Sequence, residues 1–175
     1  MPIEAEKYLG YLEHADGRLL GVFDANVGKG GCTLFADMVR AASGRELGRL
    51  PWCVTFVYAV FIESLGLERT QKLLGKPQPG SRTLARRLRR RGLWRGRGYV
   101  PARGDLVFCT NDGRRIQHVG IVLDCDGERV TTIDGNTVDD TGHFAPQQGG
   151  AVAKRTRPLD SQIIIGYGKM NITEV

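Results

Sequence analysis

The chain has 175 residues, a length that fits one domain spanning residues 1–175 and excludes two domains of ordinary size. Hydrophobic residues make up 41% of the chain and charged residues 25%, so intrinsic disorder and a fibrous repeat are both disfavoured. The formal net charge of +6 comes from one segment, 82–103, which holds nine arginines and no acidic residue. No apolar run approaches the roughly 20 residues of a membrane-spanning helix, so we predict no transmembrane segment.

The N-terminal segment lacks the pattern of a secretory signal. Glu4, Glu6, Lys7 and Glu13 are spread through it, where a signal peptide would have a basic start and then an apolar stretch. We therefore expect synthesis in the cytoplasm, followed by release through another route.

Helices are predicted in the first part of the chain, about residues 1–100. Apolar residues recur at helical spacing in the opening segment, where His14 is expected to be exposed. Thr33 is a suitable N-cap for the next helix, and the third is apolar nearly all round, as in a buried helix. The predicted helices are 3–15, 34–42, 53–65, 68–74 and an arginine-rich helix, 81–91.

Short β-type segments follow Pro101, over about residues 101–170. Turn sequences such as NDG and CDGE separate them. Helices that precede strands in this way are typical of an α+β domain, with N-terminal helices packed on a C-terminal antiparallel sheet. The predicted strands are 105–110, 118–124, 129–134, 151–155 and 162–167.

Cys53 is the candidate nucleophile, because it begins the predicted buried helix 53–65. A thiol attacks as its thiolate, and the first turn of a helix directs unpaired N–H groups and a positive dipole end at an anion. The alternative is that Cys53 packs beside Trp52 as a small hydrophobic residue. None of the four cysteines belongs to a CxxC pair, so all are predicted to be free thiols. Cys32 is a rival nucleophile, since it also precedes a helix.

His118 is the candidate base. It begins a predicted strand, and Gly120 leaves open space on the same face. A hairpin would bring Asp134 and Asn136 of the next strand beside it. A carboxylate or amide there would orient the imidazole and steady the imidazolium.

These segments together resemble a known family. The segments PWCVTFVYAVF, ARGDLVFC, HVGIVLD, TIDGNT and IIGYG occur in the order found in CHAP domains of the NlpC/P60 superfamily, papain-like peptidoglycan amidases and endopeptidases. KYLGYLEHA and the GYG ending are similar to phage- or Gram-positive-associated members. The resemblance implies Cys53 as nucleophile, His118 as base, and Asp134 with Asn136 as the residues that complete the site.

The resemblance also implies the reaction, cleavage of an amide bond in cell-wall peptides, and no cofactor. Asp134 stands where the family usually has the longer Glu, which leaves Asp134 and Asn136 as alternative partners for the imidazole. The calcium-binding loop of some members has no counterpart in ASGRELGRL, so no metal is expected.

The arginine-rich helix offers a different function. Clustered arginines bind polyanions, so Arg86, Arg87, Arg90 and Arg91 are candidates for contacts with anionic wall polymers. The alternative is that this helix is a structural surface helix, anchored through Leu84 and Leu88, whose basic face is simply solvated. An inactive wall- or polyanion-binding module is therefore the alternative to an enzyme, and specific nucleic-acid recognition is not expected.

Overall fold

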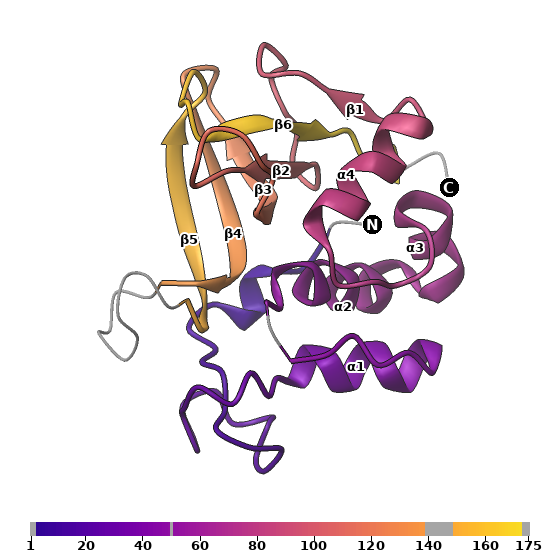
Figure 1. The fold of residues 1–175 in the computed structure, drawn as a ribbon, viewed down its shortest axis with the longest axis vertical. Coiled ribbons are helices and arrows are strands. Elements are labelled where there is room, and N and C mark those ends of the chain that lie inside the picture. The colour runs from indigo at the N-terminus through magenta and orange to yellow at the C-terminus, as the bar shows by residue number, and fades with distance from the viewer. Residues whose placement is uncertain (1–2, 50, 139–148, 173–175) are drawn as a thin grey trace.

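The computed structural model describes residues 3–49, 51–138 and 149–172, which form a layer of helices packed on an antiparallel sheet (Figure 1). The sheet order is β1-β6-β2-β3-β4-β5, and every pairing between these strands is antiparallel. The predicted α+β class is confirmed. The helices are η1 (Glu6–Tyr8, a 3-10 turn), α1 (Leu34–Ser43), α2 (Cys53–Leu65), α3 (Leu67–Leu74) and α4 (Ser81–Arg90). The strands are β1 (Trp94–Arg95), β2 (Leu106–Cys109), β3 (His118–Cys125), β4 (Arg129–Thr137), β5 (Ala151–Pro158) and β6 (Ile164–Gly168).

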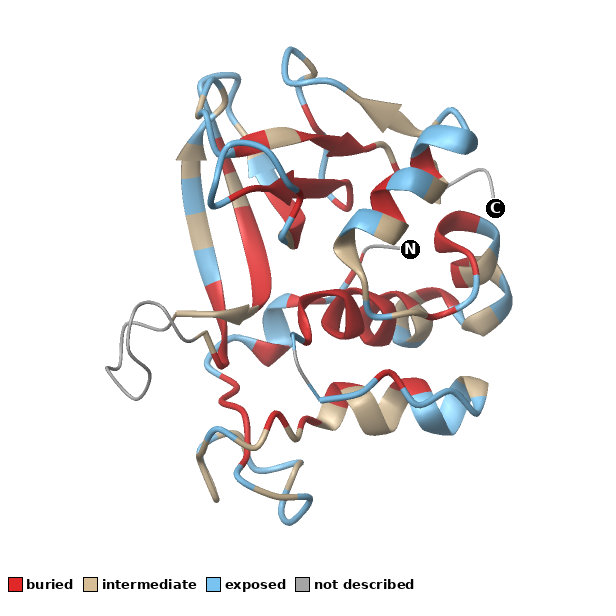
Figure 2. Cartoon of the chain, in the orientation of Figure 1, coloured by how far each residue is buried: buried red, intermediate tan, exposed pale blue. Residues whose placement is uncertain are grey.

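Helix α2 is the centre of the core. It lies between α1 and the sheet, and it contacts both β3 and β4. Every residue from Cys53 to Phe61 is buried, as the red ribbon in Figure 2 shows. Its sequence predicts this position, since it is apolar around nearly its whole circumference. Within the part of the chain that the structure describes, no helix has both the length and the hydrophobicity to cross a bilayer.

A glycine lets β4 pack closely on α2. A Cβ atom on Gly135 would lie 2.6 Å from Cβ of Phe56 and 2.8 Å from Cζ3 of Trp52. Both distances are shorter than van der Waals contact, so a larger residue would push the strand from the helix. The glycine therefore sets the spacing between the element that begins with Cys53 and the strand that carries Asp134.

The predicted helix over residues 3–15 was wrong. Only the 3-10 turn Glu6–Tyr8 forms, because Gly10 adopts φ 85°, a left-handed conformation that ends helical geometry. The following backbone pairs with β5 instead: Gly10 N–H donates to Val152 O at 3.0 Å, and Val152 N–H donates to Tyr11 O at 2.8 Å. Pairing with the sheet edge satisfies backbone groups that a helix would have satisfied internally.

The expectation that His14 is exposed was also wrong. The side chain is fully buried, and its ring stacks on Tyr11 with centroids 5.5 Å apart. Its backbone exchanges hydrogen bonds with Cys32 rather than with a helical turn. The segment around His14 is thus buried and extended rather than helical.

The other predicted elements are present with small shifts at their ends. Thr33 caps α1 as predicted, its hydroxyl accepting from Ala36 N–H at 3.2 Å. Strands β4 and β5 each extend three residues past their predicted ends, to Thr137 and Pro158. The short strand β1 was missed. The extension of β5 matters for the site, because it places Arg157 in the sheet.

Arg87 of α4 and Arg91, the C-cap residue that follows α4, hold the C-terminal end of α3. Arg91 Nη1 donates to Lys72 O at 2.7 Å and to Leu73 O at 3.0 Å, while Arg87 Nη1 donates to Lys76 O. Cations at the end of a helix satisfy its last carbonyls and oppose its negative dipole end. Arg87 and Arg91, expected on a polyanion-binding face, are therefore bound within the fold.

Replacing Gly135 by alanine is expected to destabilise the protein by about 1–3 kcal/mol, because the new methyl group overpacks the contact with Phe56 and Trp52. Urea unfolding followed by circular dichroism measures this. Gly96→Ala is the matched control, since a Cβ there meets nothing within 4 Å. Equal midpoints for the two variants would contradict the packing argument.

Candidate active site

The residue before α2 places Cys53 at the start of the helix. Trp52 is the N-cap and is almost fully buried. Its indole Nε1 donates to Glu13 Oε2 at 2.8 Å, and its ring stacks on Phe35 with centroids 5.6 Å apart. The first N–H groups of a helix have no acceptor within it, so the backbone around Cys53 presents donors and a positive dipole end.

His118 and Asp134 meet across the β3–β4 pair. His118 begins β3 and Asp134 lies in β4. The His118 Nε2 atom lies 3.0 Å from Asp134 Oδ2. The imidazole is 17% exposed whereas the carboxylate is fully buried, so solvent reaches the ring but not its acidic partner. Asp134 therefore reaches the imidazole directly, although its side chain is shorter than that of glutamate.

The Asp134 carboxylate has two further partners, which the sequence interpretation did not assign to the site. Arg157 Nη2 donates to Asp134 Oδ2 at 2.9 Å, and Thr132 Oγ1 donates to Oδ1 at 2.6 Å. Arg157 Nη1 also donates to Thr132 Oγ1 at 2.9 Å. A pattern in the sequence could have revealed Arg157. Residues 153, 155 and 157 lie on one face of β5, and this face continues beyond the predicted end of the strand.

Gly120 makes room for this carboxylate. A Cβ on Gly120 would lie only 2.0 Å from Asp134 Oδ1. The open space expected beside the imidazole exists, and the acidic side chain occupies it. A glycine is therefore needed on β3 for Asp134 to reach across from β4.

His118 and Asp134 each stabilise the charged form of the other. Burial lowers the pKa of His118, but Asp134 and the Cys53 sulfur raise it by more, so the pKa lies above its ordinary value of 6.5. Burial raises the pKa of Asp134, but His118, Arg157 and Thr132 lower it by more, so the net shift is downward. Because Nε2 faces Asp134, Nδ1 is the ring nitrogen that remains available to another group. The three side chains thus form a Cys–His–Asp series that favours an imidazolium.

Asn136 lies apart from that series. It adopts φ 55°, and its Oδ1 is buried with no hydrogen-bond partner among the described residues. The His118 imidazole donates to Asp134 rather than to Asn136. Asn136 instead lines a hollow next to the ring.

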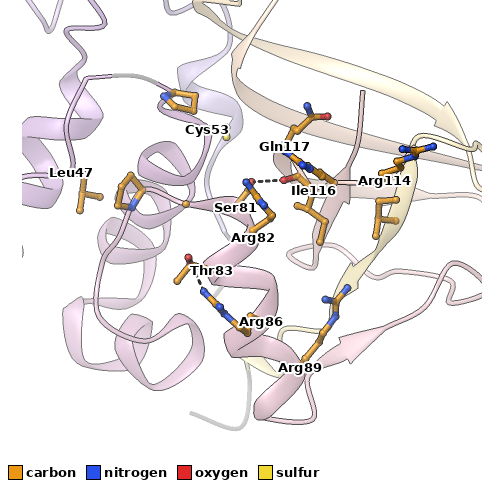
Figure 3. A pocket seen from close by; sticks show the side chains of 15 residues that line it. Leu47, Cys53, Ser81, Arg82, Thr83, Arg86, Arg89, Arg114, Ile116 and Gln117 are labelled. Carbon is orange, nitrogen blue, oxygen red and sulfur yellow. Dashed lines mark hydrogen bonds between the residues drawn. The ribbon is translucent and has the colours of Figure 1, made fainter. Parts of the chain in front are cut away.

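Two hollows meet at this site. The larger has a volume of about 970 Å³ and includes Cys53 in its lining, as seen in Figure 3. The smaller, of about 380 Å³, is lined by His118, Asn136 and Arg157 among others. Pro51 and Gln117 line both hollows. An extended substrate can therefore pass the thiol and the imidazole with one part in each hollow.

The remaining cysteines are placed differently. All four are free thiols, as predicted. Cys32 donates to Gly30 O at 3.6 Å, and no hydrogen bond joins it to an imidazole in the described ranges. Burial raises the pKa of Cys109 to about 12, which keeps that thiol neutral. No group of three or more His, Cys, Asp or Glu side chains suited to a metal ion occurs within residues 3–49, 51–138 and 149–172.

Asp105, the acidic residue of the Gly-Asp pair before β2, is structural. Its Oδ1 accepts from Met170 N–H at 2.7 Å, and its Oδ2 accepts from Tyr99 Oη at 2.8 Å. The carboxylate therefore joins the loop before β2 to the C-terminal end of the sheet.

Comparison with known proteins agrees with this arrangement. A search of curated proteins gave no match. The CHAP domain family matches residues 45–136, a range that includes α2, β2, β3 and the Asp134–Asn136 segment. CHAP domains are associated with hydrolysis of peptidoglycan, the polymer of the bacterial cell wall. Because the match covers more than half of the sequence and the observed α+β fold agrees with it, this chain belongs to the CHAP domain family.

Proposed function

We propose that the protein is a cysteine-dependent hydrolase that cleaves an amide bond in the peptides of peptidoglycan. The observation that carries this is the series of Cys53, His118 and Asp134 at the junction of two hollows. A thiol beside an oriented imidazole is the arrangement of nucleophilic catalysis. The cut bond is either that between muramic acid and L-alanine, an amidase reaction, or one within the peptides, an endopeptidase reaction.

Each side chain has a defined part in the reaction. The Cys53 thiolate attacks the amide carbonyl carbon, and the backbone N–H of Cys53 is placed to stabilise the oxyanion. The His118 imidazolium gives its Nδ1 proton to the leaving amine as the C–N bond breaks. Neutral His118 then takes a proton from water, whose oxygen attacks the thioester. The acid product leaves, and the thiolate and imidazolium are restored.

Asp134 acts on the protonation state of the imidazole. Its carboxylate accepts from Nε2, which directs Nδ1 toward the sulfur and stabilises the positive ring. Arg157 and Thr132 hold the carboxylate in turn. In this proposal Asn136 lies beside the substrate in the smaller hollow rather than orienting the base.

The cell wall is the proposed place of action. Release of the protein through a holin-type membrane lesion, as for a phage lysin, and partner-assisted export are both compatible with the proposal. A second wall-binding surface would have to use residues other than Arg87 and Arg91, which already bind the end of α3.

Replacing Cys53 by alanine is expected to abolish lysis, because the variant lacks the nucleophile. Loss of turbidity of purified cell walls measures this, with Cys32→Ala as the matched control that keeps activity. Mass spectrometry of the products separates the two reactions, since an amidase exposes the amine of L-alanine and an endopeptidase exposes a different amine. If the native protein and Cys53→Ala bind walls equally and neither lyses them, the chain is a binding module.

The His118 ring is expected to remain protonated above pH 6.5 in the native protein, since its pKa is raised. Asp134→Asn removes the main stabilising charge, so the titration should move to lower pH. Cys53→Ala should move it in the same direction by less. Nuclear magnetic resonance of the imidazole nitrogens against pH measures both shifts. A native ring that loses its proton below pH 6.5 would contradict the proposed ion pair.

Gly120→Ala is expected to lower kcat/KM by about 100-fold, because its methyl group displaces the Asp134 carboxylate and misplaces the base. Steady-state hydrolysis measures this, and circular dichroism checks that the variant is folded. Gly96→Ala serves again as the control, with activity unchanged. A folded Gly120→Ala protein with native activity would show that Asp134 needs no such space.

A further inference from the structure

The charged residues that line the larger hollow, beside Cys53, are all positive. Helix α4 forms one side of it and the segment before β3 forms the other (Figure 3). No acidic residue is among its lining residues. Five arginines contribute to the lining: Arg82, Arg86, Arg89, Arg114 and Arg115. We call this hollow the arginine groove.

These guanidinium groups lack ion-pair partners in the part of the chain that the structure describes, although the charge of Arg115 acts at longer range on Asp112. None of the five forms an ion pair with a carboxylate of the described residues, whereas Arg157, Arg103 and Arg40 each do. Two neighbouring arginines differ, since Arg87 of α4 and Arg91 just after it donate to backbone carbonyls at the end of α3.

The few contacts of the groove arginines leave donors available. The Arg86 contact to Thr83 Oγ1 is long, 3.5 Å. Arg89 stacks over the Trp94 ring at 4.2 Å, and no described residue forms a hydrogen bond with the edges of its guanidinium.

The acidic residue nearest in sequence to Arg114 and Arg115 binds their backbone. Asp112 Oδ1 accepts from both of these N–H groups at 2.8 Å, which shapes the turn. The carboxylate therefore orders the segment through its backbone, and neither guanidinium forms an ion pair with it.

The position of Cys53 decides which anion suits the groove. An occupant that reacts must place a carbonyl carbon on the sulfur, so it is a peptide, and the groove receives the part of that peptide on one side of the cut bond. Apolar Leu47, Ile116 and Ile165 also line it, as fits a peptide more than a phosphate polymer. A planar guanidinium matches a carboxylate through two parallel hydrogen bonds.

We propose that the arginine groove binds free carboxylates of the wall peptide beside the cut bond, and that the enzyme therefore prefers peptides with free carboxylates over the same peptides with carboxamides. This inference rests on the proposed function for the identity of the peptide. Amidation removes the charge but keeps the shape, so the groove discriminates by charge and by hydrogen bonding.

The test uses two synthetic wall peptides that differ only in carboxylate against carboxamide. Native protein is expected to cleave the carboxylate form with a kcat/KM about 10-fold higher, the size of a charge-assisted contact. Arg86→Gln and Arg114→Gln, on opposite sides of the groove, should bring this ratio toward one by raising KM for the carboxylate form alone. Arg90→Gln is the matched control on α4, because Arg90 does not line the groove, and it should keep the native ratio. Equal kcat/KM values for the two peptides in native protein, or an equal loss for both in the groove variants, would overturn the proposal.

Binding to the Cys53→Ala protein separates this inference from the hydrolase proposal. Calorimetry with the two peptides needs no turnover. Selective binding of the carboxylate form supports the groove even if the native protein cuts neither peptide, a result that would refute only the proposed function. Binding of a glycerol-phosphate wall polymer or of duplex DNA, with no binding of either peptide, would instead assign the groove to phosphate polyanions and overturn the inference.

Discussion

The site depends on one buried carboxylate that three donors hold in place. Asp134 has no solvent exposure, and an isolated charge there would be costly. His118, Arg157 and Thr132 each supply a hydrogen bond, so the charge is paired and its lone pairs are used. Because the paired carboxylate is negative, it stabilises the protonated form of the imidazole, and this form is the one that stabilises a neighbouring thiolate.

Small residues allow that carboxylate and the thiol to approach the same ring. Gly120 leaves the space that Asp134 fills, and Gly135 lets β4 lie against α2. The buried Trp52 indole, anchored on Glu13, then sets where α2 begins. Since α2 contacts β3 and β4 through its core face, the position of Cys53 relative to His118 follows from packing between a helix and a sheet rather than from a flexible loop.

The arginines of the chain serve three different purposes. Arg87 and Arg91 satisfy the carbonyls at the end of α3, and Arg157 holds the carboxylate of Asp134. The arginines of the groove have no carboxylate partner among the described residues and border the space beside Cys53. A charge run that looks uniform in sequence is thus divided by tertiary structure into arginines that stabilise the fold and arginines that face a substrate-sized hollow.

Elements with strong local signals were predictable from sequence alone. The apolar run from Cys53 predicted a buried helix, Thr33 predicted a cap, and the ordered motifs around Cys53, His118 and Asp134 predicted the family. Tertiary structure decided the rest, because these outcomes depend on contacts between distant residues. Gly10 and the pairing with Val152 overrode a helical pattern in the first segment, and the length of β5 brought Arg157 to a carboxylate 23 residues away. The sequence placed a space beside Gly120 but left Asp134 and Asn136 as alternatives, and the choice of Asp134 followed from the packing of β3 against β4, which brings its carboxylate into that space.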